Sequence, residues 1–330
     1  MVELKAKGVT QIIISHKLNE IARVADAITV IRDGATVDVM EEVTNLVEED
    51  RIVRAMVGRS LDERFPARDA AIGAVGFELK DWTVRHPELR DRNAIDNVSL
   101  KVRRGEVVGI AGLMGAGRTE LALSVFGRLY GQQRGGTIML DGKSIDTTTV
   151  QKAIDSGLAY VTEDRKGAGL VLGENIERNI TLANLESVSR FGVLDSSEVR
   201  DVAEGFRQRL RIRCHDVLQM VGNLSGGNQQ KVVLSKWLLT QPEVLILDEP
   251  TRGIDIGAKY EIYSIINEIA ASGKCVLMIS SEMAELLGTC DRIYVMNEGK
   301  FVGEFTSQEA SQENIMRAIV RNEVLGGKGH

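Results

Sequence analysis

An apolar run at residues 107–111 leads directly into the glycine-rich segment 112–120, which reads Gly-Leu-Met-Gly-Ala-Gly-Arg-Thr-Glu. When a strand, a glycine loop and a helix follow in this order, backbone N–H groups turn toward phosphate oxygens and the helix adds the positive end of its dipole. The segment therefore predicts a phosphate-binding loop in an α/β fold. The residues expected to contact nucleotide are Gly112, Gly115, Ala116, Gly117, Arg118, Thr119 and Glu120.

This loop departs from the usual pattern at Arg118, where a lysine is expected before Thr119. Arginine keeps the positive charge, but its planar, bulky head does not reproduce the compact ammonium contact. Glu120 places a further negative charge beside the phosphates. We expect nucleotide to bind, but more weakly. A merely structural glycine turn is the alternative for this segment taken alone.

A second apolar run, at residues 244–247, ends in the carboxylates Asp248 and Glu249. We expect Asp248 to hold Mg²⁺ together with the hydroxyl of Thr119, and Glu249 to polarise the attacking water as the catalytic residue. Acidic residues that only cap the strand are the alternative. The order of the two motifs, glycine loop first and carboxylates second, favours a nucleotide site.

The segment 223–231, Asn-Leu-Ser-Gly-Gly-Asn-Gln-Gln-Lys, predicts a helix that begins at Gly226 with Ser225 as its N-cap. A serine and two glycines at a helix start form a second anion site, which has no partner within its own domain. The candidate contacts are Ser225, Gly226, Gly227 and Gln229. A capped helix and nothing more is the alternative.

The chain contains one structural unit twice, because residues 8–37 match residues 273–302 at a constant offset of 265. Glu20, for example, aligns with Glu285. Each copy predicts an apolar run, a helical stretch, a second apolar run and a turn. The second copy closes a domain of about 260 residues, within the usual range, whereas the first copy has almost nothing before it.

These patterns predict a division of the chain. We expect a C-terminal tail of a truncated first domain at 1–64, a linker at 65–74 and a complete domain at 75–330, with a helical subdomain at about 172–239. Continuous apolar runs in the complete domain indicate parallel strands buried on both faces. Such strands are expected at 107–111, 158–161, 244–247 and 275–279. The alternating pattern of residues 77–102 suits an antiparallel lobe.

The composition narrows the function classes. A net charge of −6 argues against a general nucleic-acid binder. The chain has no run of about 18 apolar residues and no signal peptide, which predicts a cytoplasmic protein. Cys214, Cys275 and Cys290 are expected to be reduced, buried thiols. Arginines at every second position of residues 207–213 predict one solvated face of a strand, with an anion or partner site as the alternative.

Taken together, these motifs resemble the ATP-binding cassettes of ABC transporters, which are P-loop NTPases. Segment 112–119 resembles a variant Walker A loop, 245–250 the Walker B strand and 224–230 the signature. The resemblance covers residues 77–320. It implies a mostly parallel sheet flanked by helices, with an antiparallel β lobe and a helical subdomain, and it implies ATP and Mg²⁺ as cofactors.

The resemblance also implies roles for residues outside these motifs. Asp255 falls in the D-loop, Glu163 stands where a Q-loop glutamine is usual, and Ser281 stands where a switch histidine is usual. His16 occupies the switch position of the first copy as a catalytic residue. Because such cassettes pair head to tail, we expect the site built on this loop to hydrolyse poorly. Its signature would complete a stronger site that uses His16.

The particular motif forms look like the second cassette of monosaccharide importers of the ribose, xylose, galactose and multiple-sugar type. This implies an ATPase that energises uptake from the cytoplasmic face of the bacterial inner membrane. The implied partners are integral-membrane permease subunits, another cassette and, indirectly, a periplasmic sugar-binding protein. A truncated, non-hydrolysing cassette and a soluble ABC ATPase are the alternatives. Trp82 and His86 are candidates for stacking on adenine, with ordinary packing as the alternative.

Overall fold

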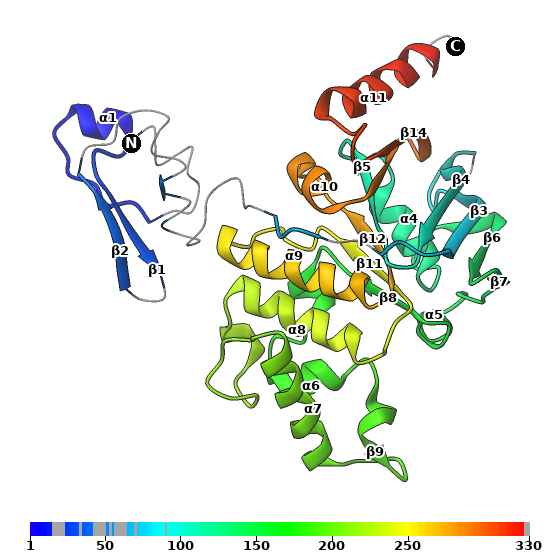
Figure 1. The fold of residues 1–330 in the computed structure, drawn as a ribbon, viewed down its shortest axis with the longest axis horizontal. Helices are drawn as coiled ribbons and strands as arrows, with labels where there is room; N and C mark the ends of the chain where they lie inside the picture. Colours follow the sequence, from blue (N-terminus) through cyan, green and yellow to red (C-terminus); the bar gives the residue numbers. More distant parts are fainter. Residues whose placement is uncertain are drawn as a thin grey trace. The chain divides into compact units, whose positions relative to one another are not determined.

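The computed structural model divides the chain into two compact units, each of which has its own core (Figure 1). The smaller unit consists of residues 1–67 with 254–261, and the larger of residues 68–253 with 262–330. The residues that the structure describes are 1–14, 24–32, 35–41, 51–52, 55, 65–68, 71–89 and 91–326.

The smaller unit contains a short helix, α1 (Val2–Ala6), and an antiparallel hairpin of β1 (Ile28–Arg32) and β2 (Ala35–Met40). Its core is formed by Ile28, Val30, Met40 and Ile52. The apolar run after Asp26 therefore forms a strand, as the internal repeat predicts. The turn that joins the two strands lies outside the described residues.

The larger unit is built on a six-stranded sheet with the order β14-β13-β5-β12-β11-β8. Its strands are β5 (Val107–Gly112), β8 (Leu158–Val161), β11 (Val244–Asp248), β12 (Cys275–Ile279), β13 (Arg292–Asn297) and β14 (Lys300–Thr306). Neighbouring strands are parallel except for the antiparallel pair β13–β14. The four predicted strands are confirmed, and their burial is nearly continuous because both faces of the sheet are covered.

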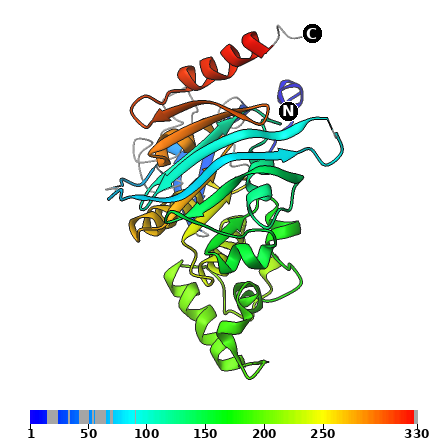
Figure 2. The ribbon, with the colours of Figure 1, turned by 90° about the vertical axis from the view of Figure 1, so that its right-hand side faces the viewer.

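An antiparallel sheet packs against the parallel one (Figure 2). Its order is β4-β3-β6-β7, formed by β3 (Val75–Arg85), β4 (Asn93–Arg103), β6 (Gln132–Leu140) and β7 (Lys143–Ser144). One hydrophobic core joins the inward faces of both sheets with α4 (Arg118–Val125). The expected antiparallel lobe is therefore confirmed, and the shared core fixes it beside the glycine loop that starts α4.

The stretch between β8 and β11 is largely helical, as expected, and forms the lower part of Figure 1. Its helices are the π-helix η2 (Arg165–Gly169), α6 (Ile176–Thr181), the 3₁₀ turns η3 (Leu185–Val188) and η4 (Val221–Asn223), α7 (Ser196–Arg209) and α8 (Gly226–Leu238). A two-stranded hairpin, β9 (Ser189–Arg190) with β10 (Val193–Leu194), separates η3 from α7.

The predicted strand at residues 207–213 is wrong. Arg207 and Arg209 lie in the last turn of α7, where positive side chains suit the negative end of the helix dipole. The helix is fixed at its other end by Asp195, whose carboxylate accepts from the backbone amides of Ser197 and Glu198. Seven residues of alternation are too short a signal to overrule a capped helix.

Four more helices complete the described fold: α5 (Val150–Asp155), α9 (Ile256–Ala271), α10 (Met283–Thr289) and α11 (Gln312–Gly326). No described helix has both the length and the apolar character needed to span a bilayer. Cys275 and Cys290 are free and buried, as predicted, whereas Cys214 is only half-buried.

Candidate nucleotide-binding site

The glycine loop lies at the carboxyl end of β5, and α4 begins directly after it. Gly117 is the N-cap of α4 with φ of 101°, a left-handed conformation that favours glycine. A Cβ atom on Gly112 would lie only 2.6 Å from the carbonyl oxygen of Met296. Gly115 is exposed and Ala116 is buried. The loop is therefore shaped by close backbone approach, as expected of a phosphate cradle.

Arg118 folds back onto the end of the neighbouring strand. Its Nη1 donates to the carbonyl oxygen of Ser280 at 2.7 Å, and its Nη2 lies 4.0 Å from Oε1 of Glu249. Both charged side chains are largely buried. The guanidinium at the variant position is thus already engaged by the protein. Glu120, in the first turn of α4, is half-buried. Burial raises the pKa of Tyr130, and the charge of Glu120 adds to that rise.

Asp248 ends β11 and is completely buried. Its Oδ2 accepts a hydrogen bond of 2.9 Å from the Tyr160 hydroxyl, while its Oδ1 has no hydrogen-bond partner among the described residues. Burial raises the pKa of Asp248 to about 6, and interactions with Thr119 and Tyr160 oppose that rise. A buried, unpartnered carboxylate oxygen beside a threonine hydroxyl suits a hard divalent cation such as Mg²⁺. Thr119 and Asp248 therefore fit the expected metal pair.

Glu249 follows with φ of 48°, and its backbone N–H donates to the carbonyl of Ile279 at 2.9 Å. A non-glycine residue in this region of φ is uncommon and is frequent at functional sites. The Ser281 hydroxyl donates to Oε2 of Glu249 at 3.0 Å. Burial raises the pKa of Glu249, and the bond from Ser281 and the charge of Arg118 act against that rise. Sequence position alone had placed Ser281 at the switch site, and the structure brings it onto the expected catalytic carboxylate.

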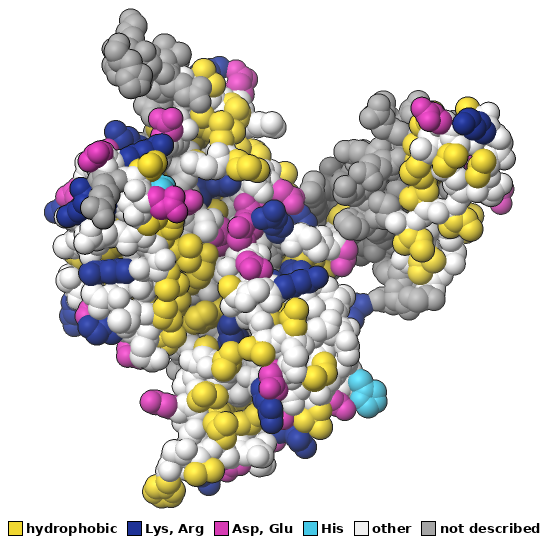
Figure 3. Space-filling model, turned by 180° about the vertical axis from the view of Figure 1, so that it is seen from behind, with side chains coloured by type: hydrophobic (Ala, Val, Ile, Leu, Met, Phe, Trp, Pro, Cys, Tyr) yellow, Lys and Arg dark blue, Asp and Glu magenta, His cyan; other side chains and the backbone are white. Residues whose placement is uncertain are grey.

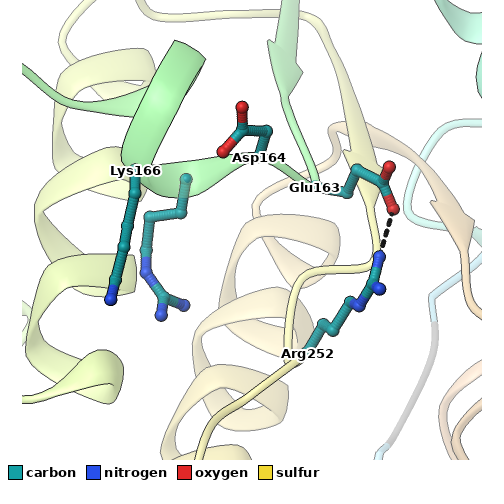
Figure 4. Close-up of a pocket in the computed structure, with 5 residues that line it drawn as sticks. Glu163, Asp164, Lys166 and Arg252 are labelled. Carbon is teal, nitrogen blue, oxygen red and sulfur yellow. Dashed lines mark hydrogen bonds and ion pairs between the residues drawn. The ribbon is translucent and has the colours of Figure 1, made fainter.

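Glu163 lines a cavity of about 370 Å³ together with Asp164, Arg165, Lys166 and Arg252. Its Oε2 accepts from Nη1 of Arg252 at 2.7 Å. Figure 4 shows this pair on one side of the cavity and the Lys166 side chain extending along the other. Glu163, at the expected Q-loop position, therefore pairs with Arg252, which lies three residues before Asp255 of the expected D-loop.

The second glycine motif forms the start of α8, as predicted, with Ser225 in the N-cap position. Its hydroxyl does not cap the helix, because it accepts from the side-chain amide of Asn228 at 3.0 Å instead. Gly227 is buried, and a Cβ atom on Gly226 would lie 3.2 Å from Nη2 of Arg165. The cationic segment after β8 therefore lies beside the signature loop, a proximity that the sequence analysis missed.

The side chain of Gln229 lies in the protein interior. The residue is buried, and its amide nitrogen donates to the carbonyl of Val221 at 3.3 Å. This geometry suits a residue that fixes the turn before α8. Asp255 is exposed, and its carboxylate accepts from the N–H of Ala258 at 2.9 Å, which is the contact that an N-cap residue makes at the start of a helix. His16 lies outside the described residues.

Stacking of Trp82 on adenine is excluded by its position. Trp82 is fully buried in the core, where its Nε1 donates to the Ser124 hydroxyl at 3.0 Å. His86 is partly exposed, but its Nδ1 accepts from the backbone amides of Glu88 and Leu89, both at 3.1 Å. The packing alternative therefore holds for Trp82, and His86 serves to fix a turn.

Comparison with known proteins decides the family. Residues 95–252 match the family model described as ABC transporter. These residues belong to the ABC transporter family. The larger unit of the chain has the fold of solved ATP-binding cassettes. One, an ATP-binding cassette of an ABC transporter, has a TM-score of 0.63 at 20% identity and covers 74% of this chain and 99% of its own.

Several curated proteins are similar to this chain in sequence. An L-arabinose transport ATP-binding protein of Geobacillus stearothermophilus is 55% identical over 99% of this chain. A xylose import ATP-binding protein of Thermoanaerobacter pseudethanolicus is 51% identical, and a ribose import ATP-binding protein of Lactococcus lactis subsp. cremoris is 45% identical, each over 95% of this chain. The chain spans only 64%, 62% and 61% of the length of these three relatives.

Proposed function

We propose that the chain is an ATP-binding and ATP-hydrolysing part of an ABC importer that takes up a monosaccharide. The observation that carries this proposal is that the glycine loop at the end of β5, Asp248 and Glu249 at the end of β11, and Ser281 after β12 lie together. These three strands are neighbours in one parallel sheet, and nucleotides bind at the carboxyl ends of such strands. The names of the sugar-import relatives support the substrate class.

In this proposal the backbone of the glycine loop and the start of α4 bind the phosphates. Thr119 and Asp248 hold Mg²⁺, which neutralises phosphate charge when bound. Glu249 orients and polarises the attacking water, and burial, which raises the pKa of this carboxylate, makes it a better proton acceptor. Ser281 holds that carboxylate by donating to one of its oxygens.

The proposed hydrolysis at this loop is slow. Arg118 is occupied by Ser280 and Glu249, so its guanidinium must leave them before it can reach a phosphate. Serine at the switch position supplies a hydroxyl where an imidazole is usual. We infer an asymmetric pair of cassettes, in which Ser225 and Gly227 complete the stronger site of the other cassette with His16. In the complete transporter, Ser225→Arg should then abolish ATP hydrolysis while Arg118→Ala reduces it partly, and the reverse ranking would refute the asymmetry.

The permease is proposed to dock on the helical part of the cassette, with the cassette held peripherally at the cytoplasmic face of the membrane. A groove of about 400 Å³ runs between α6 and α7. It is lined by apolar residues, among them Leu182, Leu185 and Leu194, together with Glu174 and Arg178. Figure 3 shows hydrophobic side chains gathered over this lower part of the molecule. Crosslinks from the permease to a cysteine placed at position 182 would support this site, and crosslinks confined to another face would refute it.

The test of the whole proposal combines binding, turnover and uptake. We expect the purified chain to bind ATP below about 1 mM and to release phosphate slowly, and we expect Glu249→Gln to abolish release but keep binding. Deleting the reading frame should abolish uptake of one monosaccharide. Failure to bind ATP would overturn the proposal.

A second candidate is a non-hydrolysing cassette, which the engaged state of Arg118 favours. Stoichiometric ATP binding with no phosphate release, alone and with its permease, would identify that case. Uptake that needs the chain but is unaffected by Glu249→Gln would point the same way.

A further inference from the structure

The hydroxyl of Tyr160 contacts the expected metal ligand in the middle of the cassette. Tyr160 lies on β8 opposite Ile246 of the neighbouring strand β11, which ends two residues later at Asp248. Its hydroxyl donates to Asp248 Oδ2 at 2.9 Å. Tyr160 is 5% exposed and Asp248 is 0% exposed, so water does not compete for this bond. A buried tyrosine hydroxyl needs a partner, and here the partner is one oxygen of the proposed magnesium ligand.

The two oxygens of Asp248 have different surroundings. Oδ2 is held by Tyr160, whereas Oδ1 is buried without a hydrogen-bond partner in the described part of the chain. An unsatisfied carboxylate oxygen in the interior is costly unless a cation completes it. Because one oxygen is held, the carboxylate cannot rotate freely about its last bond. The free oxygen therefore keeps one direction.

The ring of Tyr160 is itself fixed by its neighbours. Its centroid lies 5.7 Å from that of Phe126, which follows α4, and the Phe126 ring in turn lies 5.4 Å from the ring of Trp237 in α8. A hydroxyl on a locked ring loses little entropy when it holds a carboxylate. Groups that orient a metal ligand in this way commonly change metal affinity by about 10- to 100-fold when removed.

We propose that Tyr160 is a positioning residue for Mg²⁺-dependent nucleotide binding, in which its hydroxyl holds Asp248 Oδ2 and leaves Oδ1 to the metal. This inference rests on the proposed function of the cassette. Tyr160 touches neither nucleotide nor water in this role, and it acts only through Asp248. Tyr160→Phe therefore removes the restraint on the carboxylate while the ring packing with Phe126 is kept.

The test compares ATP affinity with Mg²⁺ and with EDTA, using a fluorescent ATP analogue on the full chain. In Tyr160→Phe we expect an unchanged affinity in EDTA and a gain from Mg²⁺ that is about 10-fold smaller than in the unmodified protein. Direct Mn²⁺ titration in the presence of ADP, followed by electron spin resonance, should show the same loss. An unchanged gain from Mg²⁺ and unchanged Mn²⁺ affinity would overturn the inference.

Tyr294→Phe is the matched control. Tyr294 is also a buried tyrosine, its hydroxyl accepts from the N–H of Lys101, and its ring packs on Phe301, but within the described residues it makes no hydrogen bond to Asp248. The control should lose stability without changing the gain from Mg²⁺. If Tyr160→Phe does not fold, Phe126→Leu keeps the hydroxyl and loosens the ring, and it should reduce the gain in the same direction. No change there would also refute the inference.

The outcome for the unmodified chain separates this inference from the proposed function. An unmodified chain that binds no ATP, or binds it equally well with and without Mg²⁺, would overturn the proposed magnesium-dependent function itself, and this inference with it. A normal gain from Mg²⁺ that persists in Tyr160→Phe would overturn only the role of Tyr160.

Discussion

Arg118 donates a hydrogen bond of 2.7 Å to the carbonyl oxygen of Ser280, at the end of the strand next to the glycine loop. The same guanidinium lies 4.0 Å from Glu249. Arg118 thus bridges two strand ends, and its guanidinium must leave both contacts to reach a phosphate. Arg118→Lys should therefore tighten ATP binding by about 5- to 10-fold, or about 1–1.4 kcal/mol, because a compact ammonium forms a charge-assisted hydrogen bond to phosphate.

The affinity for ATP in titrations of the full chain measures this effect. Arg118→Met, which removes the charge, should weaken binding, and Arg209→Lys at the exposed end of α7 should leave it unchanged. Weaker binding by Arg118→Lys than by the unmodified chain would show that the arginine is the better phosphate ligand here.

Trp82 should matter for stability and not for nucleotide. Trp82→Phe leaves a gap in the core and removes the bond to Ser124, so we expect a loss of about 1–3 kcal/mol in the free energy of unfolding. The ATP affinity should stay within about twofold. Urea unfolding and ATP titration measure the two quantities. A large loss of affinity at unchanged stability would restore the adenine-stacking role that its burial argues against.

The buried carboxylate of Glu285 holds three hydroxyls around the site. It accepts from Ser280 at 2.7 Å, from Tyr263 at 2.6 Å and from Thr251. Glu285→Ala leaves these donors without that acceptor, and we expect it to lower the free energy of unfolding by about 3–5 kcal/mol. Glu268→Ala, at an exposed position on α9, is the control and should change it by less than about 0.5 kcal/mol. Equal effects of the two substitutions would contradict the assigned network.

Sequence patterns predicted the parallel strands because a strand that is buried on both faces has a short, continuous apolar run, which is visible in the sequence. They also located polar residues at strand ends, such as Asp248 and Ser281, because ligands of parallel sheets bind at the carboxyl ends of the strands. They did not find Tyr160, because its contact depends on β8 lying next to β11, and neighbours in a sheet are set by the tertiary fold. The sequence signal that could have pointed to Tyr160 was a polar hydroxyl group within an otherwise apolar strand.

The prediction of a strand for the arginines at 207–213 was wrong for a different reason. Alternation over seven residues predicted a strand, but the segment 195–198, Asp-Ser-Ser-Glu, already contained the start signal of a helix that reaches Arg209. The folding back of Arg118 also depends on the distance between two strand ends, which no local pattern contains. A helix-capping signal should therefore count for more than a short alternating pattern when secondary structure is predicted. Contacts between strands can be identified only once the tertiary fold is known.

Lys236 gives a prediction of how stability depends on pH. Its Nζ is buried, donates to the carbonyl of Gly169 at 2.6 Å and lies 5.0 Å from the centroid of the Trp237 ring. Burial lowers the pKa of Lys236 from 10.5 to about 8. Below pH 8 the folded protein must hold a buried charge that the unfolded chain exposes to water. That penalty is complete below about pH 8, shrinks as the pH rises to 10.5 and is absent above it.

Lys236→Met should therefore stabilise the protein at pH 7, by about 1–3 kcal/mol after the loss of the bond to Gly169 is included. The advantage should shrink between pH 8 and 10 as the lysine of the unmodified protein loses its proton in the folded state. Urea unfolding at several pH values measures this difference, with Lys80→Met at an exposed position as the control. A difference between Lys236→Met and the unmodified protein that stays constant from pH 7 to pH 10 would show that the charge at Lys236 carries no folding penalty.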